Sequence, residues 1–220
     1  MEDLMEIDDI QESKTFHQLG IFCLDGSGSM SKEGEGNLPL ADQVNLAIRE
    51  FLSYFKGSSL AENFSLAFIT FDHTAKIHTD VTPLKEVDDF ADYNPQNNGH
   101  GGGTNIGNAL TIAQELAEKH LNSNEANNLP HDVKIIVMSD GLCQAVEHSI
   151  KKAHELKEND KITIFSTHFK IRKEKDDGTK DFLIKIANSV NEYKTTYSED
   201  DLRKFFIASM SAKKKMDRMD

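Results

Sequence analysis

Residues 20–30 read GIFCLDGSGSM, and this stretch predicts the type of fold. An apolar run, Gly20–Leu24, ends abruptly in the carboxylate Asp25, and the hydroxyl residues Ser27 and Ser29 follow with glycines between them. A near-continuous apolar run is typical of a strand that is buried on both faces. Because side chains two residues apart point the same way in extended backbone, we expect the three polar side chains to converge just beyond the strand.

Outward from this stretch, strand-like and helix-like patterns alternate along the whole chain. The expected strands are Phe16–Leu24, Phe64–Phe71, Ala75–Thr79, Val133–Met138, Ile162–Phe169 and Tyr193–Tyr197. The expected helices are Leu40–Phe55, Leu84–Tyr93, Thr104–Leu121, Gln144–Lys157, Phe182–Val190 and Asp200–Ser209. This alternation predicts an α/β fold: a doubly wound, mostly parallel six-stranded sheet with one short antiparallel edge strand and helices on both faces.

Length and composition suit a soluble globular protein of 220 residues, with 38% hydrophobic and 28% charged residues. We expect one domain over residues 16–209, preceded by an acidic extension, 1–15, and followed by a solvated tail, 210–220. The formal net charge of −12 argues against nucleic-acid binding and against docking on anionic membranes, because both need clustered Lys and Arg. No stretch is long and apolar enough to span a bilayer.

The cysteines and the first residues are the features of the sequence that bear on the cellular location of the protein. The cysteines, Cys23 and Cys143, have no metal-type spacing, and we expect both to be reduced thiols. The stretch Met1–Gln11 is acidic and lacks the apolar core of a signal peptide. We therefore expect a cytoplasmic location.

Two further polar positions are expected to join the first loop. Asp140 follows the buried strand Val133–Met138, and Thr104 ends the glycine-rich run 101–103. In open parallel sheets, ligands bind outside the carboxyl ends of the strands, at a topological switch point. Glycines allow the backbone to approach closely, so that the Thr104 hydroxyl can reach the same place. Carboxylates and neutral hydroxyls are hard oxygen ligands, which favour Mg²⁺ or Mn²⁺ over zinc.

Each piece also has a structural interpretation. Asp25 and Asp140 are suited to turns after strands, Ser27 and Ser29 to a flexible loop, and Thr104 to the N-cap of the following helix. It is the joint pattern that points to a metal site.

Other chemistries fit the residues less well. Ser27 lacks the Gly-x-Ser-x-Gly frame of a hydrolase nucleophile. No lysine stands in the glycine-rich loop, which excludes a P-loop. A zinc site would draw on four residues whose spacing matches no zinc motif. They are His73, His100, His168 and Cys143.

In their order and their elements, Asp25, Ser27, Ser29, Thr104 and Asp140 resemble the metal-ion-dependent adhesion site of the von Willebrand factor A (integrin I-like) domain family. The resemblance implies a Rossmann-like fold over Phe16–Ser209. It implies that the three hydroxyls bind the metal directly, that the two aspartates act directly or through water, and that an open coordination position accepts an Asp or Glu of a protein partner. It further implies a non-enzymatic interaction module.

Among members of that family, the chain resembles the tellurium-resistance-type microbial proteins in consisting of a lone domain of about this size. This likeness implies a stress-response role with kinase or phosphatase partners. The alternative is a Mg²⁺-dependent phosphatase or phosphotransferase with Asp25 as nucleophile. Haloacid-dehalogenase-like phosphatases, however, place a second Asp two residues after the nucleophile, where this chain has Ser27.

Overall fold

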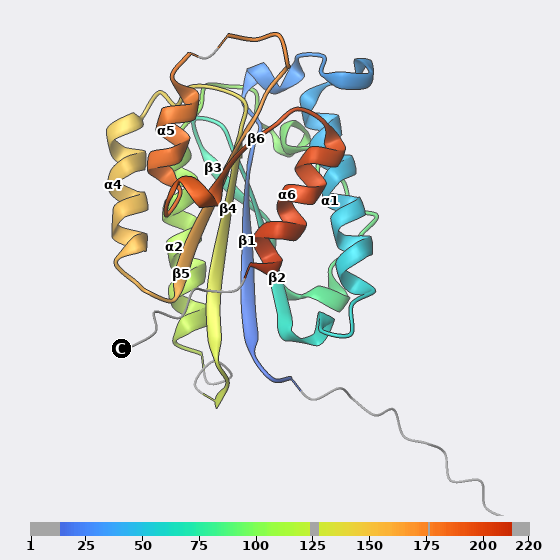
Figure 1. Cartoon of the computed structure of the whole chain (residues 1–220), viewed down its shortest axis with the longest axis vertical. Coiled ribbons are helices and arrows are strands. Elements are labelled where there is room, and N and C mark those ends of the chain that lie inside the picture. Colours follow the sequence, from blue (N-terminus) through green and yellow to red (C-terminus); the bar gives the residue numbers. More distant parts are fainter. Residues whose placement is uncertain (1–13, 124–127, 176, 213–220) are drawn as a thin grey trace, which may run out of the picture.

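The computed structural model describes residues 14–123, 128–175 and 177–212 as one sheet between two layers of helices (Figure 1). The six strands lie in the order β3-β2-β1-β4-β5-β6. All neighbours are parallel except β2 and β3, which are antiparallel. The predicted α/β fold class is therefore confirmed. The strands are β1 (His17–Asp25), β2 (Phe64–Phe71), β3 (Ala75–Pro83), β4 (His131–Ser139), β5 (Ile162–Phe169) and β6 (Tyr193–Thr196).

The helices divide between the two faces of the sheet (Figure 1). One face is covered by α1 (Leu40–Lys56) and α6 (Glu199–Ser211). The other is covered by α2 (Ile106–Leu121), α4 (Val146–Lys157) and α5 (Thr179–Ile186).

Strand β1 shows why this arrangement forms. Every residue of the strand is buried, and successive side chains enter opposite layers. Phe22 and Leu24 belong to the core under α1 and α6, whereas Ile21 and Cys23 belong to the core under α2 and α4. Only a strand that is apolar on both faces can occupy the centre of such a sheet.

The helix predicted over Leu84–Tyr93 is wrong, because only a short 3-10 turn, Leu84–Glu86, forms there. Aspartates interrupt the segment: Asp88 accepts a hydrogen bond from the Phe90 amide at 2.8 Å and Asp92 one from the Asn94 amide at 3.0 Å. Such local side-chain bonds compete with the helical pattern.

Two other boundaries shift. Strand β3 continues to Pro83, beyond the predicted end at Thr79. Helix α5 starts three residues earlier than predicted and stops at Ile186. The chain leaves the helix there because Asn188 bonds to the edge of β5: its amide donates to the Ile164 carbonyl at 3.0 Å, and its Oδ1 accepts from the Ile164 amide at 2.7 Å.

The predicted ends of the domain fall partly outside the described residues, which exclude 1–13 and 213–220. The predicted tail begins at Met210, but Met210 is buried and belongs to α6. Within the described segments, no helix combines the length and hydropathy needed to cross a membrane.

Candidate functional site

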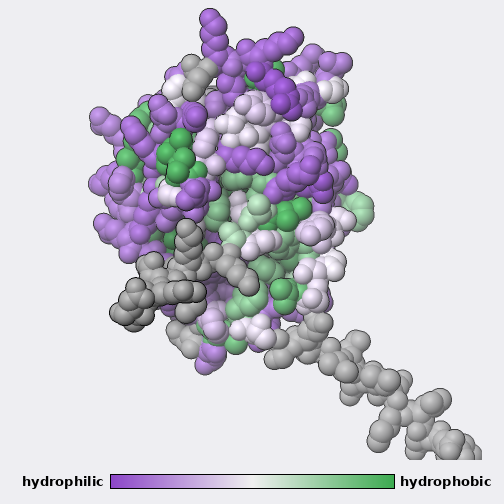
Figure 2. Space-filling model, viewed as in Figure 1, coloured by the Kyte–Doolittle hydropathy of each residue, from purple (hydrophilic) through white to green (hydrophobic). Residues whose placement is uncertain are grey.

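The candidate site lies where the strand order reverses. From β1 the chain continues to β2 on one side of the sheet, while β4 lies on the other side and leads on to β5. Asp25 is the last residue of β1 and Asp140 follows β4, so both stand at the carboxyl end of this switch point. Figure 2 shows that the corresponding end of the molecule, uppermost in the view, is mostly hydrophilic.

The first loop brings its hydroxyls together, although not in the way predicted. Residues Gly28–Ser31 form a 3-10 turn, with the Met30 amide donating to the Ser27 carbonyl at 3.0 Å, so the expected extended backbone is wrong. The Ser27 and Ser29 hydroxyl oxygens nonetheless lie 3.1 Å apart. Ser29 Oγ also donates to Asp140 Oδ1 at 2.7 Å, which joins two segments distant in sequence.

Asp25 is fully buried, and its recorded donors are neutral. Its Oδ1 accepts from the Ser27 amide at 2.8 Å, and its Oδ2 accepts from the Ser139 hydroxyl at 2.5 Å. Burial, together with the nearby charge of Asp140, raises the pKa of the Asp25 carboxyl to about 7. An ionised Asp25 therefore lacks the positive charge that usually accompanies a buried carboxylate.

Asp140 is also buried, and burial raises the pKa of its carboxyl above the ordinary value. Two neighbouring carboxylates that are both penalised by burial suit a divalent cation, which would balance their charge. Across the described residues, no group of three or more His, Cys, Asp or Glu side chains is placed to hold a metal. A cation at this rim would therefore also need the hydroxyls, a donor set that fits Mg²⁺ or Mn²⁺.

The histidines and the cysteine considered for zinc each have another contact, and they do not form a cluster among the described residues. His73 Nδ1 and His100 Nδ1 each lie 3.1 Å from a carboxylate oxygen of Asp72. Cys143 Sγ contacts the Ser149 hydroxyl at 3.2 Å, and His168 Nε2 lies 3.3 Å from the Asp140 carbonyl oxygen.

The glycine-rich loop packs against the first loop and carries Thr104 to its edge. The Gly28 amide donates to the Gly102 carbonyl at 2.9 Å. A side chain at Gly28 would place its Cβ 2.9 Å from the Gly101 carbonyl oxygen, so this close approach requires glycine. Gly101 itself has a φ of +141°, which other residues rarely adopt.

Thr104 is buried, and it is not the N-cap of the helix as predicted. Helix α2 begins at Ile106 with Asn105 in the capping position. The Thr104 carbonyl accepts from the Gln144 amide at 2.9 Å, which ties the loop to the segment after β4. Its hydroxyl has no hydrogen-bond partner among the described residues, so this oxygen is available to a ligand.

Asp72 stands in the turn between β2 and β3, and it also contacts the glycine-rich loop. Its Oδ1 accepts from the Thr74 amide at 2.8 Å, as expected of a turn residue. Its Oδ2 accepts from the Gly102 amide at 3.0 Å and so holds the glycine-rich loop in place. Burial raises the pKa of Asp72, but these hydrogen bonds outweigh it and hold the pKa well below its usual range. The available signal was its position after β2, equivalent to that of Asp25 after β1.

Two more supporting residues were not identified from the sequence. Ser139 orients Asp25 through the hydrogen bond described above. Gln96 Nε2 donates to the Ser27 carbonyl at 2.9 Å and to the Ser31 hydroxyl at 3.0 Å. Both side chains fix the first loop, and neither contact has a signature in local sequence.

Comparisons with known proteins agree with this fold. A family model described as the von Willebrand factor type A domain matches residues 21–209. No curated protein sequence gives a significant match. Among solved structures, the pilus adhesin SpaC from Lactobacillus rhamnosus GG is similar with a TM-score of 0.68 and 12% identity, over 90% of this chain and 30% of that chain.

Two other solved structures share the fold. The vWF domain of the type V pili tip protein Mfa5 from Porphyromonas gingivalis has a TM-score of 0.62 and 12% identity, over 92% of this chain and 99% of that chain. Proximal thread matrix protein 1 from the mussel byssus, in a structure with a zinc-occupied MIDAS motif, has a TM-score of 0.58 and 18% identity, over 89% of this chain and 45% of that chain. The chain thus spans less than half the length of SpaC and of the mussel protein.

Proposed function

The chain belongs to the von Willebrand factor type A domain family, and from this premise we propose that it is a metal-dependent, non-enzymatic protein-interaction module. The proposed ligands of the metal are Asp25, Ser27, Ser29, Thr104 and Asp140. The proposed metal is Mg²⁺, with Mn²⁺ as a close substitute.

The observation that carries the proposal is the buried carboxylate pair at the switch point. Asp25 and Asp140 are both shielded from water, and the recorded side-chain partners of each are neutral donors. Negative charge on these two groups is therefore not balanced by an ion pair among the described residues, and a bound cation would balance it. A cation held by few direct carboxylates would supply residual positive charge for an incoming anion, and we propose an Asp or Glu side chain of a partner protein as that anion.

The solved structures with this fold support the proposal. One of them holds zinc in its MIDAS motif, and two others are pilus proteins, one of them named an adhesin. For this chain we favour Mg²⁺, because hydroxyl and carboxylate oxygens are harder ligands than zinc prefers. We further propose a stress-response role with kinase or phosphatase partners, which follows from the sequence resemblance. A cytoplasmic location is a separate proposal, which the two cysteines, expected to be reduced, support.

Metal binding is tested by titrating the protein with MgCl₂ and MnCl₂ in a calorimeter. We expect one site in the wild type and an affinity reduced by about 100-fold in Asp25→Asn, because a buried charged ligand is lost. Asp80→Asn, an exposed aspartate on β3, is the matched control and should bind like the wild type. Equal metal affinity in Asp25→Asn and the wild type would refute the proposed site.

Carboxylate recognition is tested with the peptide acetyl-Gly-Asp-Gly-amide and the ¹⁵N-labelled protein. With Mg²⁺ present, we expect the peptide to shift the amide resonances of Ser27, Ser29 and Thr104. The shifts should be absent in EDTA and in Asp25→Asn. Undiminished binding in EDTA would contradict a metal-dependent interaction.

A further inference from the structure

Beside the candidate metal site lies a cavity of about 230 Å³ that the metal ligands only partly line. Ser29 and Asp140 form one side of it. The other side comes from the end of β5 and the segment that follows, with His168 and Lys170 nearest the sheet. The cavity therefore extends the site from β4 toward the next strand.

Strand register places Lys170 at the same edge of the sheet as Asp140. Ser139 of β4 pairs with His168 of β5, so Asp140 and Lys170 follow a matched pair at the carboxyl ends of adjacent strands. The Lys170 amide donates to the Thr196 carbonyl at 3.0 Å, which fixes its backbone against β6. The lysine is thus held by the sheet rather than by an exposed loop.

Lys170 is only 8% exposed, and its ammonium has no hydrogen-bond or ion-pair partner among the described residues. This is unusual, because lysines are almost never so deeply buried unless they are paired. Because Lys170 lines the cavity, an anion that enters the cavity can pair with its ammonium.

The other charged groups of the cavity do not supply that partner. Glu174 pairs with Lys32 at 3.0 Å, and Asp177 accepts hydrogen bonds from the amide and hydroxyl of Thr179. Asp140 accepts from Ser29, as described above. Each of the cavity's carboxylates therefore has a partner of its own, whereas Lys170 has none within residues 14–123, 128–175 and 177–212. Lys175, the remaining lysine of the cavity, is exposed to solvent.

We propose that Lys170 forms a second anion-binding position, so that the site recognises an acidic protein segment through two carboxylates. One carboxylate completes the metal site and the other pairs with Lys170; this inference rests on the proposed function. Lys170 lines the cavity beside the candidate metal site, and its ammonium is not used by any ion pair among the described residues. A carboxylate is the group of a protein ligand that pairs with such an ammonium.

The test compares two peptides on the Mg²⁺-loaded, ¹⁵N-labelled protein by chemical-shift titration. The first is acetyl-Gly-Asp-Gly-amide, with one carboxylate, and the second is acetyl-Gly-Asp-Gly-Asp-Gly-amide, with two. We expect the diacid to bind the wild type about 10-fold more tightly, as a charge-assisted hydrogen bond provides. In Lys170→Met, which keeps the length of the side chain, the two peptides should bind equally, with the affinity for the monoacid unchanged.

Lys173→Met is the matched control, because Lys173 is an exposed lysine of the same segment that does not line the cavity. It should keep the preference for the diacid. A wild type that binds both peptides equally would overturn the role of Lys170 and leave the proposed function intact, and this result does not depend on the folding of any variant. A diacid preference that survives in Lys170→Met would also overturn it. Failure of both peptides to bind would defeat the proposed function itself.

Discussion

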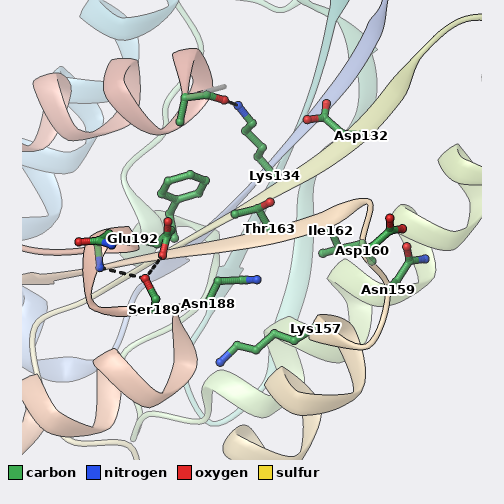
Figure 3. Close-up of a pocket in the computed structure, with 13 residues that line it drawn as sticks. Asp132, Lys134, Lys157, Asn159, Asp160, Ile162, Thr163, Asn188, Ser189 and Glu192 are labelled. Atoms are coloured by element: carbon green, nitrogen blue, oxygen red, sulfur yellow. Dashed lines mark hydrogen bonds between the residues drawn. The ribbon is translucent and has the colours of Figure 1, made fainter. Parts of the chain in front are cut away.

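Two ionisable side chains are buried at opposite ends of the central strands, and they differ in what surrounds them. Lys134, toward the amino-terminal end of β4, donates to the carbonyl oxygens of Met210, at 3.1 Å, and Ala212. Figure 3 shows this lysine reaching toward the end of α6, beside a cavity of about 640 Å³. Asp25, at the carboxyl end of β1, has neutral donors and a second carboxylate for neighbours.

This difference in surroundings distinguishes Lys134, whose charge the fold itself compensates, from Asp25, whose charge we propose a ligand compensates. The end of α6 offers Lys134 two carbonyl oxygens and the negative end of the helix dipole, so the chain itself compensates this ammonium. Burial still lowers the pKa of Lys134. Asp25 is equally shielded from water, but the chain gives its carboxylate only neutral donors. We expect this arrangement where a bound ligand supplies the missing positive charge.

The largest expected effect is a pH dependence of the metal-free protein. The pKa of Asp25 is raised to about 7 from an ordinary value of 3.8, so the folded state binds the proton more tightly than the unfolded state does. Its contribution to stability is therefore present at low pH and is lost as the pH rises through about 7. Between pH 5 and 7.5 this loss should be roughly 2–3 kcal/mol.

Urea unfolding in EDTA at several pH values measures this effect. Asp25→Asn removes the titrating group, so the difference between the wild type and this variant isolates Asp25 from other titrating groups. If the two proteins show the same pH dependence, Asp25 is compensated inside the fold, and the contrast with Lys134 fails.

A smaller loss of stability is expected when Lys134, near the amino-terminal end of β4, is replaced. Lys134→Met keeps an apolar stem of similar length but removes the ammonium that donates to the carbonyls of Met210 and Ala212. Gln18 still donates to the Met210 carbonyl at 2.9 Å, so the loss falls mainly on Ala212 and should cost about 2 kcal/mol of unfolding free energy. Metal affinity should not change. Lys151→Met, on the exposed surface of α4, serves as the control and should be neutral. A Lys134→Met variant as stable as the wild type would show that the ammonium is poorly compensated.

The smallest expected effect is on metal affinity, when the hydroxyl that orients Asp25 is removed. Ser139→Ala removes the hydroxyl that donates to Asp25 Oδ2. Because groups that orient a metal ligand are worth about a factor of 10 or more, Mg²⁺ affinity measured by calorimetry should fall about 10-fold. A metal affinity equal to that of the wild type would mean that Asp25 is oriented by the Ser27 amide alone.

Much of the fold was predictable because its signals are local. The apolar runs of β1, β2, β4 and β5 each correspond to a strand that is buried on both faces, and the alternation with amphipathic helices indicated the layers. The prediction failed over Leu84–Tyr93, where apolar spacing suggested a helix but aspartate side chains captured the backbone amides. Propensity and periodicity do not register that competition.

The candidate site also has residues that the sequence indicates and contacts that only the tertiary structure reveals. Asp25, Ser27, Ser29, Thr104 and Asp140 could be proposed from the sequence alone, because the polar residues at the ends of buried strands follow from residue order. The hydrogen bond from Ser139 to Asp25, the second role of Asp72 and the unpartnered charge of Lys170 were decided only by tertiary structure. They depend on strand register and on which loops meet, and these contacts join residues that lie tens of positions apart and carry no joint pattern along the chain.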